Sequence, residues 1–447
     1  MNQKRFKEIL NKFVVYLYPN IKILNEVEFE DKEYAVLLDN GTINCKGDIN
    51  SNKGFTISID SIFLPNDANL LNNFISEIYL IESYEDLKSE YVETLITTAL
   101  NTAIARTLSN KSYKIISKVI NGLSRYSERT YEGRNIQYGV IISDKLESEK
   151  KISNTNFDSF ISNPSSAVLT NGTESFIEVD SEGYVIRYLQ LNSEKNEYGL
   201  APYNYTRILE YCGEDNTGIV LSQKGEILIF HDNEIKYTKR GGRWNPYSHK
   251  ETIRLIHERS ENDNLLFAKA VYLTALDISF STTGGIISFL NENEVQNALR
   301  HINIKDIVNE KYFEIKKKQM IDDKDYDWQS IKDVSFQDYL KQTYNGKSCV
   351  LERLIDNRKF FMLYRKLRQE LVSIDGATII DYNGDIVALG AIVKIEAGSM
   401  GGGRLAAAKT LSQYGISIEI SSDASIKGYA LDMNNNPEVI FSISDYI

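Results

Sequence analysis

The most regular pattern of apolar and polar positions lies between Leu371 and Ala430, where short apolar runs are separated by glycine-containing turns. Runs of this length between turn residues are typical of β-strands. The predicted elements are a strand at 371–374, a hairpin at 379–389 and a strand at 416–420. Residues 398–403 are rich in glycine and lead directly into the alanine-rich residues 404–409, where we expect a helix to begin.

Residues 1–160 combine helical and strand-like patterns, which predicts an α/β domain. Apolar residues recur three and four positions apart in some segments and form short runs in others. The predicted helices are 6–17, 68–81 and 91–120, and the predicted strands are 27–38, 55–64 and 136–143.

A polar stretch at 143–173, dominated by Ser, Asn, Lys and Glu, predicts a linker or a long surface loop. The short apolar runs that follow predict an antiparallel sheet between 174 and 245. Its predicted strands are 176–179, 183–191, 218–222, 225–230 and 234–239. The arginines and glycines at 240–243 fit either a phosphate contact or a closing turn packed by Trp244, and a helix is expected from Thr252.

The charged stretch 305–347 interleaves aromatic residues with Lys and Asp, which predicts amphipathic helices inserted outside the core. Two roles fit this stretch: a surface that binds a partner protein, or a solvent-exposed cap. Together, the patterns predict a multi-domain α/β protein. Its predicted parts are an N-terminal α/β domain (1–160), a β-rich middle segment (161–260) and a C-terminal mixed sheet flanked by helices (261–447).

Composition narrows the classes of function. A net charge of −11 and a pI near 5.2 argue against broad nucleic-acid binding, because a phosphate backbone attracts a basic surface. No apolar run approaches the roughly 20 residues that span a bilayer, so no membrane partner is expected. Charges throughout Met1–Tyr18 argue against a signal peptide. The three cysteines lie far apart, which fits reduced thiols and a cytoplasmic location.

The four histidines show no metal-ligand spacing, which argues against zinc catalysis and against a Ser-His-Asp triad in the C-terminal part. Residues 398–403 are the better candidate for a site. Free amides of a glycine loop at a helix N-terminus bind anions, although a plain tight connection accounts for the same glycines. Asp375, upstream at a strand end, adds a hard oxygen ligand for Mg²⁺ or Mn²⁺ bound to nucleotide phosphates.

Three motifs follow one another in this region: Asp375-Gly376-Ala377, Gly401-Gly402-Gly403-Arg404-Leu405 and Ser421-Ser422-Asp423. They resemble the diadenylate cyclase (DAC) family, which carries Asp-Gly-Ala, then Gly-Thr-Arg-His-Arg at a helix start, then a strand ending in a serine and an acidic pair. Residues 275–280 and 284–287 look like the opening helix and first strand of that family. The resemblance covers roughly residues 265–447.

The chain departs from the family at the second motif. Gly402, Gly403, Arg404 and Leu405 stand where the family has Thr, Arg, His and Arg. In the family those side chains hold phosphates and help to coordinate the metal, whereas leucine cannot bind a phosphate oxygen and arginine cannot ligate a cation. The chain is also similar to DAC-like domains with altered motifs that are thought to sense nucleotides.

The resemblance therefore implies a nucleotide-binding sensor that recognises an adenine nucleotide or a cyclic dinucleotide without efficient cyclase activity. Asp375 and Asp423 would bind Mg²⁺ or Mn²⁺. The N-terminal parts, or an effector protein, would respond to occupancy. The nucleotide-binding residues that the resemblance implies are Asp375, Gly376, Ala377, Gly401, Gly402, Gly403 and Arg404.

The alternative is an active diadenylate cyclase in which Asp375 and Arg404 are catalytic. Two ATP molecules would be joined to cyclic di-AMP as the 3′-hydroxyl of each attacks the α-phosphate of the other. Such a reaction consists mainly of positioning and charge neutralisation. It requires a homodimer with facing domains, because each site holds one nucleotide.

Overall fold

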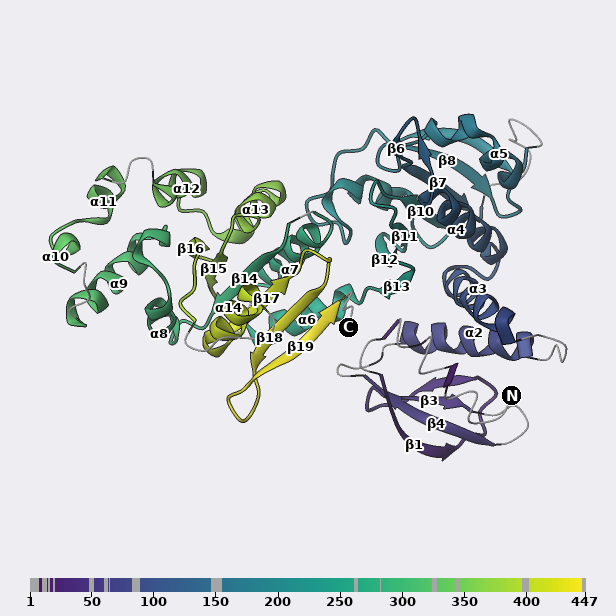
Figure 1. The fold of residues 1–447 in the computed structure, drawn as a ribbon, viewed down its shortest axis with the longest axis horizontal. Helices are drawn as coiled ribbons and strands as arrows, with labels where there is room; N and C mark the ends of the chain where they lie inside the picture. Colours follow the sequence, from purple (N-terminus) through teal and green to yellow (C-terminus); the bar gives the residue numbers. More distant parts are fainter. Residues whose placement is uncertain are drawn as a thin grey trace. The chain divides into compact units, whose positions relative to one another are not determined.

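The computed structural model describes residues 8–9, 14, 17–18, 21–47, 52–59, 63, 65–82, 89–145, 155–260, 264–281, 283–323, 328–342, 346–395 and 402–443. The chain divides into two compact units. The first holds Met1–Gly199 and Asn204–Tyr247, and the second holds Leu200–Tyr203 and Ser248–Tyr446. Both units contain helices and β-sheets, which confirms the multi-domain α/β class (Figure 1).

The first unit begins with an antiparallel sheet in the order β1-β4-β3-β2. Its strands are β1 (Lys22–Glu28), β2 (Ala35–Leu37), β3 (Ile43–Lys46) and β4 (Lys53–Ser58). The single strand predicted at 27–38 is wrong, because the acidic residues Glu30 and Asp31 fall in the connection between β1 and β2. β4 confirms the strand predicted at 55–64 as far as Ser58, and the helix predicted at 6–17 lies mostly outside the described residues.

Three helices follow this sheet. They are α2 (Pro65–Glu82), α3 (Ser89–Leu108) and α4 (Tyr113–Ser127). α2 confirms the helix predicted at 68–81, but the single helix predicted at 91–120 is wrong. The hydroxyl of Ser109 accepts hydrogen bonds from the amides of Lys111 and Ser112, which breaks the helical path. The apolar periodicity crosses this break because α3 and α4 bury residues in the same core.

The second sheet of this unit has the order β13-β12-β11-β10-β7-β8-β9. Its strands are β7 (Tyr138–Ser143), β8 (Ser175–Asp180), β9 (Val185–Gln190), β10 (Asn216–Leu221), β11 (Ile227–His231), β12 (Glu234–Arg240) and β13 (Arg243–Pro246), with the small hairpin β5 (Thr130–Tyr131) and β6 (Arg134–Asn135) ahead of them. The strands predicted between 176 and 239 are confirmed. The strand pairs within 174–245 are antiparallel, as predicted, but they do not form a sheet by themselves, because β7 lies between β8 and β10 and is parallel to β8. Since β7 lies between β10 and β8, this sheet takes strands from both sides of residue 160.

Part of the polar stretch predicted as a linker at 143–173 is helical. It forms α5 (Phe157–Ser162) and a 3₁₀-helix (Pro164–Val168), while 146–154 lie outside the described residues. The side chains of Asn156 and Asn163 accept hydrogen bonds from amides at the starts of these helices, so polar residues act here as N-caps. The turn at 240–243 joins β12 to β13 beside the buried Trp244, which confirms the closing turn.

The second unit is built on a mixed sheet in the order β16-β15-β14-β17-β18-β19. Its strands are β14 (Gly285–Leu290), β15 (Ala377–Asp381), β16 (Ile386–Ala391), β17 (Gly415–Ile420), β18 (Ile426–Leu431) and β19 (Pro437–Ile443). β14 and β15 are parallel, and the other neighbouring pairs are antiparallel. The hairpin predicted at 379–389 and the strand predicted at 416–420 are therefore confirmed.

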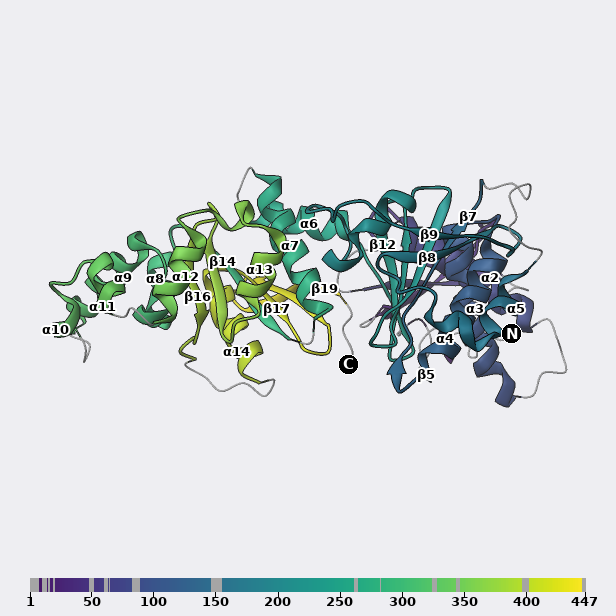
Figure 2. The ribbon, with the colours of Figure 1, turned by 90° about the horizontal axis from the view of Figure 1, so that it is seen from above.

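Helices cover this sheet on both faces. α7 (Leu265–Ser279) and α13 (Arg365–Val372) pack against each other on one face, and α14 (Gly403–Leu411) lies on the other (Figure 2). α14 confirms the helix predicted from 404. The strand predicted at 371–374 is wrong, because Leu371 and Val372 form the last turn of α13. The buried face of α13 also contains Arg365 and Arg368, and these charged residues hide the apolar periodicity of a helix.

The charged stretch at 305–347 contains helices, as predicted, but they do not lie outside the core. Tyr312, Phe313 and Phe336 are buried in the same apolar cluster as Ile286 and Ile379 of the sheet. The remaining helices of the second unit are α6 (His249–Arg259), α8 (Val295–Ala298), α9 (Glu310–Asp322), α10 (Trp328–Ile331), α11 (Phe336–Gln342) and α12 (Lys347–Ile355). None of the described helices has both the length and the apolar composition that a membrane span requires.

Candidate functional site

Segments that are far apart in sequence meet at one edge of the second unit's sheet. β14 and β15 are parallel, with Ile286 opposite Ala377, so both strands begin at this edge. β17 is antiparallel to β14, with Ile420 opposite Gly285, so it ends there. The residues beside these strand ends are Thr283 and Gly284 before β14, Asp375 and Gly376 before β15, and Ser421, Ser422 and Asp423 after β17. Two of the predicted site segments, at 375–376 and 421–423, therefore share one edge with the residues that precede β14.

The Asp375–Gly376 turn is held by close backbone contact. Gly376 has a φ of 109°, and a Cβ at this position would lie 2.4 Å from the carbonyl carbon of Gly390. Only glycine fits this conformation and this approach. Asp375 is exposed, whereas Ala377 is buried as the first residue of β15. The turn thus presents the Asp375 carboxylate to solvent on a fixed backbone.

Lys347, the first residue of α12, contacts the strand against which this turn packs. Nζ of Lys347 donates to the carbonyl oxygen of Gly390 at 2.5 Å and pairs with Oδ1 of Asp306 at 2.7 Å. Asp306 is only 1% exposed, and its other oxygen accepts the amide of Ile392 at 3.3 Å. Because Gly390 packs directly against the carbonyl oxygen of Asp375, the Lys347–Asp306 pair fixes the strand on which the turn rests.

The glycine loop and Arg404 occupy the start of α14. Gly402 is the N-cap residue with a φ of 90°, and Gly403 is the first helical residue. Among the described atoms, none lies within 4 Å of a Cβ built at either glycine. Such a helix start directs backbone N–H groups outward, where they can bind an anion. Gly401 lies outside the described residues.

Arg404 is exposed, and its guanidinium lies beside Gly284, the residue before β14. A Cβ at Gly284 would lie 2.5 Å from Nη1 of Arg404 and 2.6 Å from the carbonyl oxygen of Ile420. Gly284 therefore leaves the space in which the guanidinium rests. This contact places the positive charge of Arg404 at the same sheet edge as Asp375 and Asp423.

Two carboxylates at the end of β17 and in the turn after it differ in their electrostatics. Burial raises the pKa of Glu419, against the opposing effects of the Tyr429 hydroxyl and of the positive charges of Lys427 and Arg404. For Asp423, partial burial also raises the pKa, but hydrogen bonds outweigh it, and the pKa lies below its ordinary value. The donors are the amide of Ser425 and nearby serine hydroxyls. Asp423 is therefore negatively charged at neutral pH.

The metal prediction depends on a bound nucleotide. Within the described ranges, no three His, Cys, Asp or Glu side chains gather so that they could hold an ion by themselves. Mg²⁺ usually takes one or two protein carboxylates and completes its shell with water and substrate phosphates. The exposed carboxylates of Asp375 and Asp423 fit that role, because both belong to turns at the edge where Arg404 can receive phosphate.

Sequence patterns had missed four residues at this edge. A Gly-Gly pair between a helix and a strand was a usable signal for Gly284, and a single carboxylate inside an apolar strand was one for Glu419. Lys347 and Asp306 had no such signal. Lys347 donates to a backbone carbonyl that is remote in sequence, and Asp306 pairs with that lysine, so no local spacing encodes these contacts.

A comparison with protein-family models found no match for this chain. A comparison with curated proteins found no match either.

Proposed function

We propose that the second unit is a nucleotide-binding sensor domain that recognises an adenine nucleotide or a cyclic dinucleotide. The observation that carries this proposal is the meeting of an exposed arginine, a glycine-capped helix start and two exposed carboxylates at one sheet edge. Phosphates, a divalent cation and ribose hydroxyls are bound by groups of these kinds. The resemblance to the DAC family supplies the adenine nucleotide as the expected ligand.

Each residue has a separate role in this proposal. Gly402 and Gly403 offer backbone amides to phosphate, and Gly401 is assigned the same role from the sequence. Arg404 adds a permanent positive charge beside those amides. Asp375 binds Mg²⁺ or Mn²⁺, or a ribose hydroxyl, and Asp423 supplies a second carboxylate to the metal.

The sensor is favoured over an enzyme because the phosphate-holding side chains of the family's second motif are replaced. Leucine at 405 offers no hydrogen bond, and arginine at 404 repels a metal where the family has a metal-coordinating histidine. An active diadenylate cyclase is the second candidate. It is supported by the exposed carboxylates of Asp375 and Asp423 at this edge, which are the kind of group that holds a divalent cation for phosphoryl transfer.

The two candidates are separated by incubating the purified full chain with ATP and Mn²⁺ or Mg²⁺ and analysing the products by chromatography. The sensor predicts no cyclic di-AMP, together with a nucleotide-dependent rise in melting temperature. Ligand at a hundred times its Kd stabilises the folded state by about 2.7 kcal/mol, which a thermal shift detects.

Asp375→Asn is the matched control for this experiment. Cyclic di-AMP formed by the wild type and lost in Asp375→Asn would establish the cyclase and reject the sensor. Neither product nor thermal shift with ATP and cyclic di-AMP would reject both functions.

A further inference from the structure

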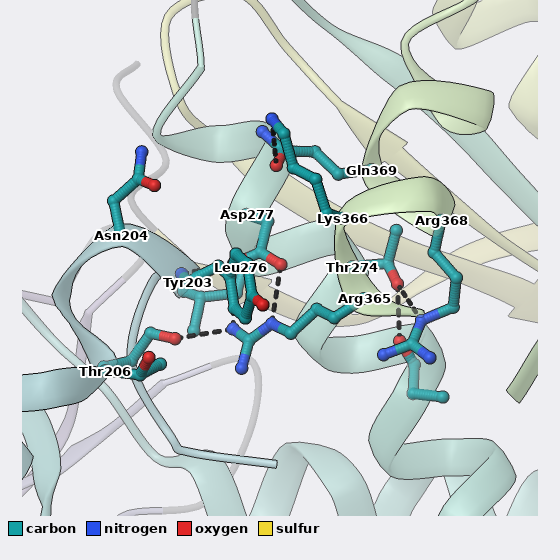
Figure 3. A network of polar contacts seen from close by, with 12 residues as sticks. Tyr203, Asn204, Thr206, Thr274, Leu276, Asp277, Arg365, Lys366, Arg368 and Gln369 are labelled. Atoms are coloured by element: carbon teal, nitrogen blue, oxygen red, sulfur yellow. Dashed lines mark hydrogen bonds and ion pairs between the residues drawn. The ribbon is translucent and has the colours of Figure 1, made fainter. Parts of the chain in front are cut away.

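A buried ion pair joins helices α7 and α13 in the second unit (Figure 3). Nε of Arg365 donates to Oδ2 of Asp277 at 2.7 Å, and Nη2 donates to Oδ1 at 2.8 Å. The side chains are 0% and 1% exposed, so water does not compete for these contacts. Because both groups are planar and the contact has two points, it fixes the distance and the rotation between the helices.

The same ion pair holds the segment Leu200–Tyr203. Nη2 of Arg365 donates to the carbonyl oxygen of Ala201 at 2.6 Å, and the amide of Tyr203 donates to Oδ1 of Asp277 at 2.8 Å. The Tyr203 ring lies against the guanidinium, with the ring centroid 5.5 Å from its central carbon. This segment belongs to the second unit, whereas the chain on both sides of it belongs to the first.

Arg368 ties the two helices together a second time. Its Nε donates to Oγ1 of Thr274 at 3.1 Å, and its Nη1 donates to the carbonyl oxygen of Leu363 at 2.5 Å. Arg368 is 2% exposed, and Thr274 is fully buried. In Figure 3, Arg365 and Arg368 extend from α13 toward residues of α7. A shift of one helix against the other would break several buried contacts together.

Both helices lead directly into the candidate nucleotide site. α7 ends shortly before Gly284, on which Arg404 rests, and α13 ends shortly before the Asp375–Gly376 turn. The two loops also touch, because Oγ1 of Thr283 donates to Oγ of Ser373 at 3.3 Å. The position of α7 relative to α13 therefore sets the spacing of the two site loops.

We infer that Asp277 and Arg365 are positioning residues of the nucleotide site and couple its occupancy to Leu200–Tyr203. A bound nucleotide favours one spacing of the two site loops and so shifts α7 relative to α13. The Asp277–Arg365 ion pair passes this shift on to Leu200–Tyr203, the segment that it holds by hydrogen bonds. Because coupling between two positions is reciprocal, the hold on this segment also sets the affinity for nucleotide. The inference rests on the proposed nucleotide site and adds the regulation of that site.

Hydrogen exchange of the full chain, followed by mass spectrometry, tests this coupling. A peptide covering residues 200–206 contains the Tyr203 amide that donates to Asp277. ATP with Mg²⁺, or cyclic di-AMP, is expected to slow exchange there by about fivefold or more, the lower end of typical coupling factors. A peptide from α9 reports any general stabilisation of the second unit, and is expected to change much less.

Two variants identify the route of the response. Arg365→Lys keeps the charge but loses the planar two-point contact. It is expected to bind nucleotide with reduced affinity and to show no nucleotide-dependent change at 200–206. Arg404→Glu is expected to lose the response together with binding. Should Arg365→Lys fail to fold, the wild-type measurement still decides, since it needs no variant.

The outcomes separate this inference from the function on which it rests. A thermal shift with ATP or cyclic di-AMP but unchanged exchange at 200–206 would overturn the coupling and leave the sensor standing. A full exchange response in Arg365→Lys would also overturn it. The absence of any thermal shift would reject the nucleotide site, and the coupling with it.

Discussion

Replacing Arg365 with methionine is expected to destabilise the second unit by about 3–5 kcal/mol, the usual cost of removing one partner of a buried ion pair. The variant leaves the Asp277 carboxylate without its cation at a position that is 1% exposed. It also removes the donor to the carbonyl oxygen of Ala201. Denaturant unfolding of wild type and variant, followed by circular dichroism, measures the loss.

Lys366→Met is the matched control for this prediction. Lys366 is the next residue of α13 and pairs at the surface with Glu370, with both side chains more than half exposed. Its loss is expected to cost about 1 kcal/mol or less. The double variant Asp277→Asn/Arg365→Met removes both charges and is expected to recover part of the stability. Equal stability of Arg365→Met and Lys366→Met would contradict the structural role of the pair.

Gly376→Ala is expected to be the second most damaging change. A Cβ at this position meets the carbonyl carbon of Gly390 at 2.4 Å, and the φ of 109° is unfavourable for alanine. Backbone strain and overpacking each cost about 1–3 kcal/mol, so a combined loss of about 3 kcal/mol is expected. Displacing the start of β15 also moves the Asp375 carboxylate, so nucleotide binding should weaken as well.

Gly213→Ala serves as its control. Gly213 lies outside the left-handed region, and no described atom is within 4 Å of a Cβ built there. Stability close to that of the wild type is expected for this variant, and unfolding midpoints compare the two directly. If Gly376→Ala proved as stable as Gly213→Ala, the turn would not have the tight geometry that the site requires.

The local features of the second unit could be predicted where the pattern and the turn chemistry agree. The hairpin at 379–389 is marked by apolar runs around Gly384, which has a φ of 86°. The start of α14 is marked by glycines followed by alanines. The end of α13 could not be predicted, because Arg365 and Arg368 are buried through partners on another helix and the sequence does not reveal those partners.

The residues of the candidate site also fall into those that local sequence pattern identifies and those that it does not. Asp375, Arg404 and Asp423 could be named because each stands beside a strand or helix terminus that local pattern marks. They share one edge because β14 and β15 pair in parallel. Helices α8 to α13 lie between these two strands in the sequence, so local pattern does not reveal the pairing. Lys347 and Asp306 could not be named, since the contacts of Lys347 with Gly390 and with Asp306 depend on how the helices between β14 and β15 pack.

The most direct test of the account is isothermal titration of the full chain with ATP–Mg²⁺ and with cyclic di-AMP, comparing wild type, Arg404→Glu and Lys409→Glu. Lys409 is the matched control, because it is exposed in the last turn of the same helix. The account predicts binding to wild type and Lys409→Glu, and a loss of about tenfold or more in Arg404→Glu, since a hydrogen bond to a charged group contributes about 1.5–3 kcal/mol. Equal binding by Arg404→Glu and wild type, or no binding of either nucleotide to wild type, would contradict it.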